Sequence, residues 1–273
     1  MPARSKLGQN FLHDPQAVQR IVAALGPCDG RTVVEIGPGR GAITRPLAAR
    51  CAHLLAIELD PELAAHLRTD VPAENLTVLT QDVLQFNFEA ASAQAGSPLL
   101  VAGNLPYYIT SPILLHLAAA HASLERAVLM VQREVADRVT ARPGSRDNGL
   151  LSVTAQLYGP VEPLFTLPPD AFSPPPKVHS AVFRWRFAPR FAQLAVPERP
   201  FLAFLRQVFA QKRKTLANNL RAAHFDSPAI AAALAHAGIP AQARAETLPL
   251  EAFAALWHSL NEKGAASPSE ATP

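Results

Sequence analysis

Four short apolar runs alternate with helix-like segments in the first part of the chain, and this alternation limits the possible folds more than any other feature of the sequence. The runs cover residues 32–36, 54–57, 76–79 and 99–103. Strands that alternate with helices in this way build sheets whose faces are covered by helices. The sequence therefore predicts an open α/β sheet.

Residues of a kind that binds ligands stand at the ends of these four runs: Gly37, Glu58, Asp82 and Asn104. Each of them alone has a structural explanation, because glycine loops are common after strands and acids cap helices and turns. In open α/β sheets, however, ligands bind at the carboxyl ends of the strands. The recurrence of such residues at four successive strand ends favours one shared cleft.

The glycine-rich segment Gly37-Pro-Gly-Arg-Gly41 predicts a backbone that approaches a ligand closely. Its spacing is Gly-x-Gly-x-Gly and not the Gly-x-Gly-x-x-Gly of nicotinamide enzymes, so an NAD oxidoreductase is a distant alternative. Glu58 lies 21 residues after Gly37, the distance at which a second-strand acid reaches ribose hydroxyls. Asp82 can accept a hydrogen bond from an adenine amine, or it can cap a turn.

The segment Asn104-Leu-Pro-Tyr-Tyr108 places a carboxamide, a proline and two aromatic rings at the end of an apolar run. The side-chain oxygen of Asn104 and the carbonyl of Leu105 can each accept one N–H of an exocyclic amine, and Tyr107 can stack on a flat ring. A plain strand-to-helix connection is the alternative. As a binding segment, its chemistry suits a flat, amine-bearing ring.

The composition excludes several classes of protein. Hydrophobic residues make up 49% of the 273 residues, which is ample for a core. No apolar run is long enough to cross a bilayer and the first residues form no signal peptide, so we expect a cytoplasmic protein without membrane contact. Cys28 and Cys51 are expected to be buried free thiols, and the nine histidines form no cluster that would predict a metal site.

The second half of the chain predicts three more strands, at residues 127–131, 161–167 and 178–187, whereas residues 150–158 fit a helix or a strand. The proline-rich segment 172–177 is stiff, so Phe172 can be held against a bound base or packed in the core. Helical spacing then dominates. We predict a first domain over 1–188, a basic helical domain over 189–262 and a disordered tail over 263–273.

Basic residues concentrate between residues 184 and 221, where nine Lys or Arg face one acid, although the whole chain carries a net charge of only +3. Such asymmetry is typical of a surface that binds a polyanion, and a solvated helix face is the alternative. The apolar residues at helical spacing over 201–209 predict a helix, and the basic run 211–214 is expected to continue it. The residues predicted to contact the polyanion are Arg206, Lys212, Arg213, Lys214 and Arg221.

The order of the motifs resembles that of the ribosomal RNA adenine dimethyltransferases. The motifs are Gln-Asn-Phe-Leu at 9–12, Glu-Ile-Gly-Pro-Gly-Arg-Gly at 35–41, Glu-Leu-Asp at 58–60, Gln-Asp at 81–82, Asn-Leu-Pro-Tyr at 104–107 and Phe-Ser-Pro-Pro-Pro-Lys-Val at 172–178. The resemblance runs from about Lys6 to Leu260. The leucine of Asn-Leu-Pro-Tyr and the proline-rich motif favour the enzymes of small-subunit RNA over those of large-subunit RNA.

The resemblance implies a Rossmann-like, seven-stranded methyltransferase sheet with a small C-terminal α-helical domain. It also implies S-adenosylmethionine as the cofactor, contacted by Asn10, Leu12, Gly37, Glu58, Asp82 and Asn104. The catalytic residues that frame the target adenine would be Asn104, Leu105, Pro106, Tyr107 and Phe172. The implied substrate is 16S ribosomal RNA in an immature small ribosomal subunit, modified by a monomer. The polyanion predicted to bind the basic helical domain would then be this RNA, so the domain is an implied RNA-binding domain.

Three alternatives to this function remain. The first is a non-catalytic RNA-binding or ribosome-assembly factor on the same fold, although the intact motifs argue against it. The second is a large-subunit ribosomal RNA adenine methyltransferase, which shares the core motifs. The third is a DNA adenine or protein amide methyltransferase, because these enzymes use related Asn/Asp-Pro-Pro-Tyr turns.

Overall fold

The computed structural model describes residues 9–264. The predicted disordered tail, residues 263–273, therefore lies almost entirely outside the described residues. The chain forms two compact units. The first contains residues up to 140 together with 158–188, and the second contains 141–157 together with the residues from 189 onward.

The first unit is built on a seven-stranded sheet in the order β4-β3-β2-β5-β6-β9-β7. Its strands are β2 (Thr32–Ile36), β3 (His53–Glu58), β4 (Leu76–Thr80), β5 (Leu99–Asn104), β6 (Leu124–Gln132), β7 (Val161–Leu167) and β9 (Ser180–Arg186). The pairs from β4 to β6 are parallel, and β9 pairs antiparallel with both β6 and β7. The predicted α/β class and the seven strands are confirmed.

The strand order reverses direction between β2 and β5, and this reversal fixes where a ligand can bind. From β2 the chain moves outward to β3 and β4, and from β5 it moves to the other side through β6. A crevice opens at such a switch point, outside the carboxyl ends of the strands. Gly103 keeps the two central strands close, because a Cβ there would lie 2.6 Å from the Ile36 carbonyl oxygen.

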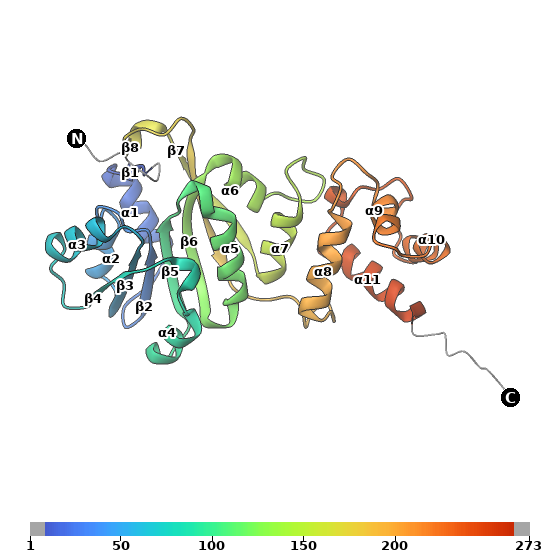
Figure 1. Cartoon of the computed structure of the whole chain (residues 1–273), viewed down its shortest axis with the longest axis horizontal. Helices are drawn as coiled ribbons and strands as arrows, with labels where there is room; N and C mark the ends of the chain where they lie inside the picture. The colour runs from blue at the N-terminus through green and yellow to red at the C-terminus, as the bar shows by residue number, and fades with distance from the viewer. Residues whose placement is uncertain (1–8, 265–273) are drawn as a thin grey trace. The chain divides into compact units, whose positions relative to one another are not determined.

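Helices cover both faces of this sheet, and Figure 1 shows α1 and α5 on opposite sides of it. The helices are α1 (Pro15–Ala24), α2 (Thr44–Ala48), α3 (Pro61–Asp70), α4 (Phe88–Ala95), α5 (Thr110–Ala119) and α6 (Arg133–Val139). Aspartates cap two of these helices: Asp14 accepts from Gln16 N at 2.8 Å, and Asp60 accepts from Glu62 N at 2.9 Å. Both acids precede a proline at the first helical position, as expected for helix starts.

One large core joins α1 and α2 to the sheet. It contains Ile21 and Leu47 from the helices and Leu54, Leu100 and Val128 from the strands, all of them buried. The two cysteines are buried free thiols, as predicted. Because these helices are fixed to the sheet, the loops at its carboxyl edge rest on a rigid base.

A separate two-stranded ribbon brings the N-terminal segment to this edge. Strand β1 (Phe11–Leu12) pairs antiparallel with β8 (Phe172–Ser173). The amide of His13 extends the ribbon by donating to the Ala171 carbonyl at 3.0 Å. The segment over residues 9–12, which contains the predicted cofactor contacts Asn10 and Leu12, is thus held in place by its backbone.

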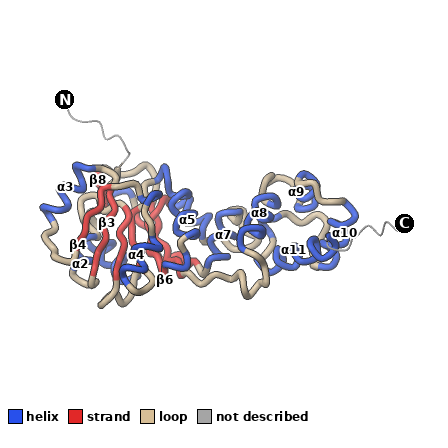
Figure 2. The backbone as a smooth tube through the Cα atoms, turned by 60° about the horizontal axis from the view of Figure 1, so that its bottom comes forward, coloured by secondary structure: helices blue, strands red, loops and turns tan. Residues whose placement is uncertain are grey.

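The second unit is entirely helical in the described residues, and Figure 2 shows the strands confined to the first unit. Its helices are α7 (Leu150–Tyr158), α8 (Glu198–Val208), α9 (Leu216–Ala222), α10 (Ser227–His236) and α11 (Leu250–Gly264). The last residue of α7, Tyr158, is counted with the first unit. Phe201, Phe204 and Phe253 are buried in its core. None of the helices within residues 9–264 is long and apolar enough to span a membrane.

The boundary between the units differs from the predicted one in one segment. The first unit ends at Ala188, but residues 141–157 belong to the second unit. Val153 and Leu157 of α7 pack in the second unit's core, and the Asn148 side chain donates to the Glu246 carbonyl at 2.9 Å. The ambiguous segment 150–158 is a helix. Its apolar residues pack against helices that lie 40 or more residues later in the chain.

The predicted continuation of the helix through the basic run is wrong. Helix α8 ends at Val208, and residues 212–214 form a turn before α9. The buried Asn219 side chain shapes this turn: its Nδ2 donates to the Val208 carbonyl at 2.8 Å and its Oδ1 accepts from Gln211 N at 3.1 Å. A side chain that bonds backbone groups in this way offers them an alternative to helix.

Candidate active site

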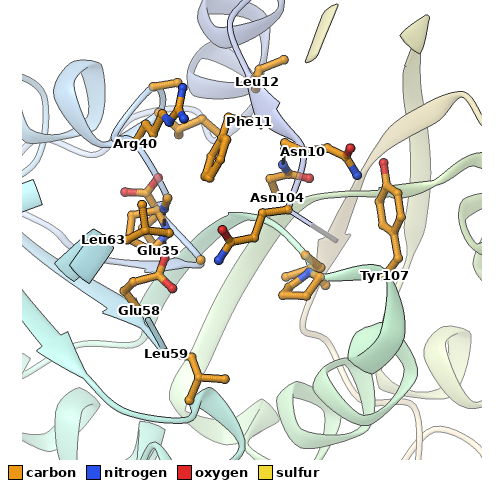
Figure 3. Close-up of a pocket in the computed structure, with 18 of the residues that line it drawn as sticks. Asn10, Phe11, Leu12, Glu35, Arg40, Glu58, Leu59, Leu63, Asn104 and Tyr107 are labelled. Atoms are coloured by element: carbon orange, nitrogen blue, oxygen red, sulfur yellow. Dashed lines mark hydrogen bonds between the residues drawn. The ribbon is translucent and has the colours of Figure 1, made fainter. Parts of the chain in front are cut away.

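A pocket opens at the carboxyl ends of β2, β3 and β5, at the switch point of the sheet. Its volume is about 110 Å³, against roughly 10–15 Å³ for a single water on a comparable measure, so a small organic ligand fits. Figure 3 shows Phe11, Glu35, Glu58 and Asn104 around this space. The predicted site residues that line it are Asn10, Leu12, Gly37, Glu58, Asn104, Leu105, Pro106 and Tyr107.

The glycine loop and Glu58 form one wall. Gly37 and Gly39 have φ angles of +65° and +55°, which L side chains rarely adopt. The Glu58 carboxylate accepts from Gly39 N at 3.1 Å and from Asp60 N at 3.0 Å, and burial raises its pKa. The two oxygens of a carboxylate offer about four acceptor sites together, so Glu58 can still accept a hydrogen bond from a ligand hydroxyl.

Glu35 is a buried acid on β2 that was not among the predicted site residues. It lines the pocket, its side chain is 1% exposed, and its Oε2 has no hydrogen-bond partner among the described residues. Burial raises its pKa to about 8, the nearby Thr44 hydroxyl lowers it in part and the Glu58 charge raises it. An unpartnered buried carboxyl is costly unless a ligand supplies a donor or a positive charge.

The Asn104 side chain lies at the centre of the site. Its Nδ2 donates to the Asn10 carbonyl at 3.1 Å, while the Leu105 amide is held by the Met130 carbonyl at 2.9 Å. Asn104 Oδ1 and the Leu105 carbonyl oxygen accept no hydrogen bond from any donor within residues 9–264. Two acceptors on adjacent residues are therefore available to one ligand.

The aromatic residues take different positions. Tyr107 is fixed by a hydrogen bond between its hydroxyl and Ser180 Oγ at 2.9 Å, and burial raises its pKa. Ser180, which the sequence analysis missed, is fully buried on β9. Tyr108 lines the same pocket but is 55% exposed.

Comparison with known proteins decides the family. The model of the family described as ribosomal RNA adenine dimethylase matches residues 2–262. The chain belongs to the ribosomal RNA adenine dimethylase family. The family prediction is thereby confirmed.

Several relatives of this family are named for the small ribosomal subunit. The chain is 59% identical over 261 residues to ribosomal RNA small subunit methyltransferase A of Acidobacterium capsulatum, covering 95% of this chain and 92% of that protein. It is 48% identical over 271 residues to the protein of the same name from Koribacter versatilis, covering 95% of each.

Two solved structures resemble nearly the whole chain. The 23S rRNA methyltransferase ErmE is 28% identical with a TM-score of 0.71, over 92% of this chain and all of that one. A dimethyladenosine transferase from Plasmodium falciparum has a TM-score of 0.80 at 23% identity, over 93% and 98% of the two chains. The fold of the dimethylase family thus extends through both units.

Two predicted site residues of this family member do not line the pocket. Asp82 caps the short 3-10 helix Val83–Gln85, accepting from Leu84 N at 2.9 Å, so its contact with the cofactor stays a prediction. Phe172 is 2% exposed and packs in the core beside Leu12. This position agrees with the alternative interpretation from the sequence, in which Phe172 packs in the core. Phe172 could stack on a base only after its ring had left the core.

The predicted RNA contacts all lie in the second unit. Arg206 is in the last turn of α8, Arg221 is in the last turn of α9, and Lys212, Arg213 and Lys214 lie on the turn between these helices. All five are exposed. Arg221 also donates to Asn218 Oδ1 at 2.6 Å, so its charge is partly engaged within the helix.

Proposed function

We propose that this protein transfers methyl groups to the N6 amines of two adjacent adenosines in 16S ribosomal RNA, giving dimethyladenosine. The methyl donor is S-adenosylmethionine, whose sulfonium supplies an activated methyl group when bound. The substrate is an immature small ribosomal subunit, the enzyme acts as a monomer, and its location is the cytoplasm. The names of the two most similar relatives described above and the family description support this assignment.

The pair of free acceptors on Asn104 and Leu105 carries the chemical part of the proposal. An aromatic amine is a weak nucleophile because its lone pair is delocalised into the ring. Two acceptors that hold its hydrogens turn the lone pair out of the ring plane and toward one direction. The asparagine is no base at neutral pH, and none is needed before transfer, because the cationic product amine loses its proton readily to water.

The opposite side of the pocket fits the proposed cofactor. Glu58 offers acceptor oxygens suited to ribose hydroxyls, and Gly37 and Gly39 let the backbone approach a ligand closely. The unpartnered Oε2 of the buried Glu35 suits a ligand that carries a positive charge. These residues fit a nucleoside with a charged amino-acid part, and they form the site together with Asn10 and Leu12.

Tyr107 and the basic second unit are assigned to the RNA. A ring fixed by Ser180 at the mouth of the pocket can stack on an extruded base, which contributes roughly 1–3 kcal/mol per base. The exposed cations from Arg206 to Arg221 provide the sequence-independent attraction to phosphates. Catalysis and RNA attraction are thereby assigned to different units of the chain.

The Asn104→Ala variant tests the function. We expect single-turnover methylation of 16S RNA to fall about a hundredfold or more, because the amine loses an orienting acceptor, while RNA affinity stays within about twofold. Methylation at the wild-type rate by the purified variant would show that Asn104 has no catalytic role.

The substrate is tested by offering the wild-type protein small-subunit RNA, large-subunit RNA, DNA and protein with labelled cofactor. Label in the small-subunit RNA alone is the expected result. Label in the large-subunit RNA would favour the activity named for ErmE, whose structure the chain resembles. Absence of label in all four, together with RNA binding, would favour the non-catalytic assembly factor.

A further inference from the structure

The N-terminal segment over residues 9–12, which we call the strap, is anchored at two places. Its backbone pairs with β8, where Phe11 is opposite Ser173 and Leu12 is opposite Phe172. On the other side, the ring of Phe11 lies against the glycine loop. A Cβ on Gly39 would lie 3.0 Å from Phe11 Cδ1, so a side chain there would crowd the ring and force it to shift.

A cation completes the second anchor. The guanidinium carbon of Arg40 lies 4.4 Å from the centre of the Phe11 ring, within the range of a cation–π interaction. The strap therefore spans the pocket from the β8 ribbon to the glycine loop. Figure 3 shows Phe11 and Arg40 together at the side of the pocket opposite Tyr107.

The strap also determines which way the Asn104 carboxamide faces. A backbone carbonyl can only accept, so the amide group that meets the Asn10 carbonyl at 3.1 Å must be the Nδ2 donor. The Oδ1 acceptor is then turned away from the strap. Without this contact, rotation of the carboxamide could exchange the positions of nitrogen and oxygen, and nitrogen cannot accept an N–H from a substrate amine.

We propose that the strap is a positioning element for methyl transfer: the Asn10 carbonyl sets the orientation of Asn104, and Phe11 holds the strap in place to do so. The inference rests on the proposed function, because it assumes that Asn104 Oδ1 receives the target amine. The strap lines the same pocket as Glu58 and Gly37. A ligand bound in this pocket therefore contacts the strap as well.

A double-mutant cycle of Phe11→Ala and Asn104→Ala tests the proposal by single-turnover methylation at saturating cofactor and RNA. Phe11→Ala should lower the rate about ten- to a hundredfold in the wild-type background. In the Asn104→Ala background it should lower the rate less than twofold, because no carboxamide is left to orient. Independent, multiplicative losses would overturn the proposal, since they are what a purely structural or cofactor-binding role of Phe11 predicts.

The chain offers a matched control in Phe165. An arginine also lies over the Phe165 ring, with the guanidinium carbon of Arg20 at 3.7 Å from the ring centre. Phe165 itself lies on β7, at the edge of the sheet, and does not line the pocket. Phe165→Ala should leave the single-turnover rate unchanged. A loss equal to that of Phe11→Ala would mean that either substitution simply weakens the fold.

Hydrogen exchange of the ligand-free protein provides a second readout that does not need activity. Phe11→Ala removes the ring that anchors the strap against the glycine loop, so it should raise the exchange rate of the peptide that covers residues 9–13 by about tenfold relative to the wild type. Unchanged exchange overturns the strap proposal even when the wild type methylates RNA. If the variant exchanges faster but the wild-type protein methylates no RNA, the proposed function is wrong and the strap contact still stands.

Discussion

The buried carboxyl of Glu35 is the residue whose chemistry depends most strongly on its surroundings. It lies on the central strand β2, is fully enclosed, and has one oxygen without a partner among the described residues. Burial is the main reason that its pKa rises to about 8. In the unfolded chain the same carboxyl titrates near 4.5. Glu35 is therefore protonated in the folded, ligand-free protein at neutral pH.

This shift gives a pH dependence with a definite sign. Between pH 4.5 and about 8 the folded state holds a proton that the unfolded state has lost, so the Glu35 contribution to stability falls as the pH rises and levels off above about 8. Glu35→Gln removes this contribution. Relative to the wild type, the free energy of unfolding of the variant should therefore rise from pH 5 to pH 8, by at most about 4 kcal/mol over these three pH units.

Urea unfolding at several pH values measures the difference between Glu35→Gln and the wild type. A difference that stays constant from pH 5 to pH 8 would show that Glu35 titrates normally. Repeating the titration with S-adenosylmethionine tests the fit of the pocket, because a positively charged ligand beside Glu35 favours the ionised carboxylate and should lower the pKa of that group.

At the residue scale, the sequence predicted single side chains but not their partners. Glu58 and Asn104 were predicted because strand ends at the carboxyl edge of an α/β sheet bind ligands. The hydrogen bonds from Tyr107 to Ser180 and from Asn104 to Asn10 join residues 73 and 94 positions apart. No local sequence pattern predicts bonds between such distant residues. Phe172 shows the same limit, since a stiff proline-rich segment does not reveal whether its aromatic side chain packs inward.

At the scale of elements, the turn between α8 and α9 presents the basic run. Asn219 is 2% exposed and bonds both Val208 and Gln211, so the backbone that leads into residues 212–214 is held from inside the unit. The lysines and the arginine of the run are exposed. A cationic turn on a rigid base can approach a phosphate backbone more closely than the side of a helix.

Neutralising Lys212, Arg213 and Lys214 to glutamine should weaken RNA binding and lower the slope of log Kd against log salt by about 2 units, as expected for three lost phosphate contacts. Fluorescence anisotropy with a 16S RNA fragment at several salt concentrations measures the slope. A variant with the exposed arginines at positions 20, 50 and 68 changed to glutamine matches the net charge. Equal slopes in the two variants would mean that the turn has no special part in binding.

Elements with local signals were predicted well, and those without them were not. An aspartate followed by proline marks a helix start through contacts within four residues, and α1 and α3 both begin in this way. The end of α8 depends on Asn219, eleven residues beyond Val208, and the spacing of apolar residues does not contain that information. The basic run was accordingly assigned to a helix when it forms a turn.

At the scale of the whole molecule, the sequence predicted the sheet and the helical second unit but not the full path of the chain. The change from strand to helical spacing near residue 188 is visible in the sequence because the periodicity itself changes. The membership of residues 141–157 is not visible, because α7 follows strands and resembles a helix of an α/β unit. Only its contacts within the helical unit decide where it belongs.

The interleaved path has a consequence for any attempt to study the methyltransferase unit alone. Cutting the chain after Ala188 leaves α7 attached while deleting the residues that bury Val153 and Leu157. We expect fragment 1–188 to aggregate or to bind a hydrophobic dye. A version with residues 141–157 replaced by a glycine–serine linker of equal length should stay monomeric in size-exclusion chromatography. Isolating one half of this protein therefore requires excising an internal piece, since no single cleavage point separates the two hydrophobic cores.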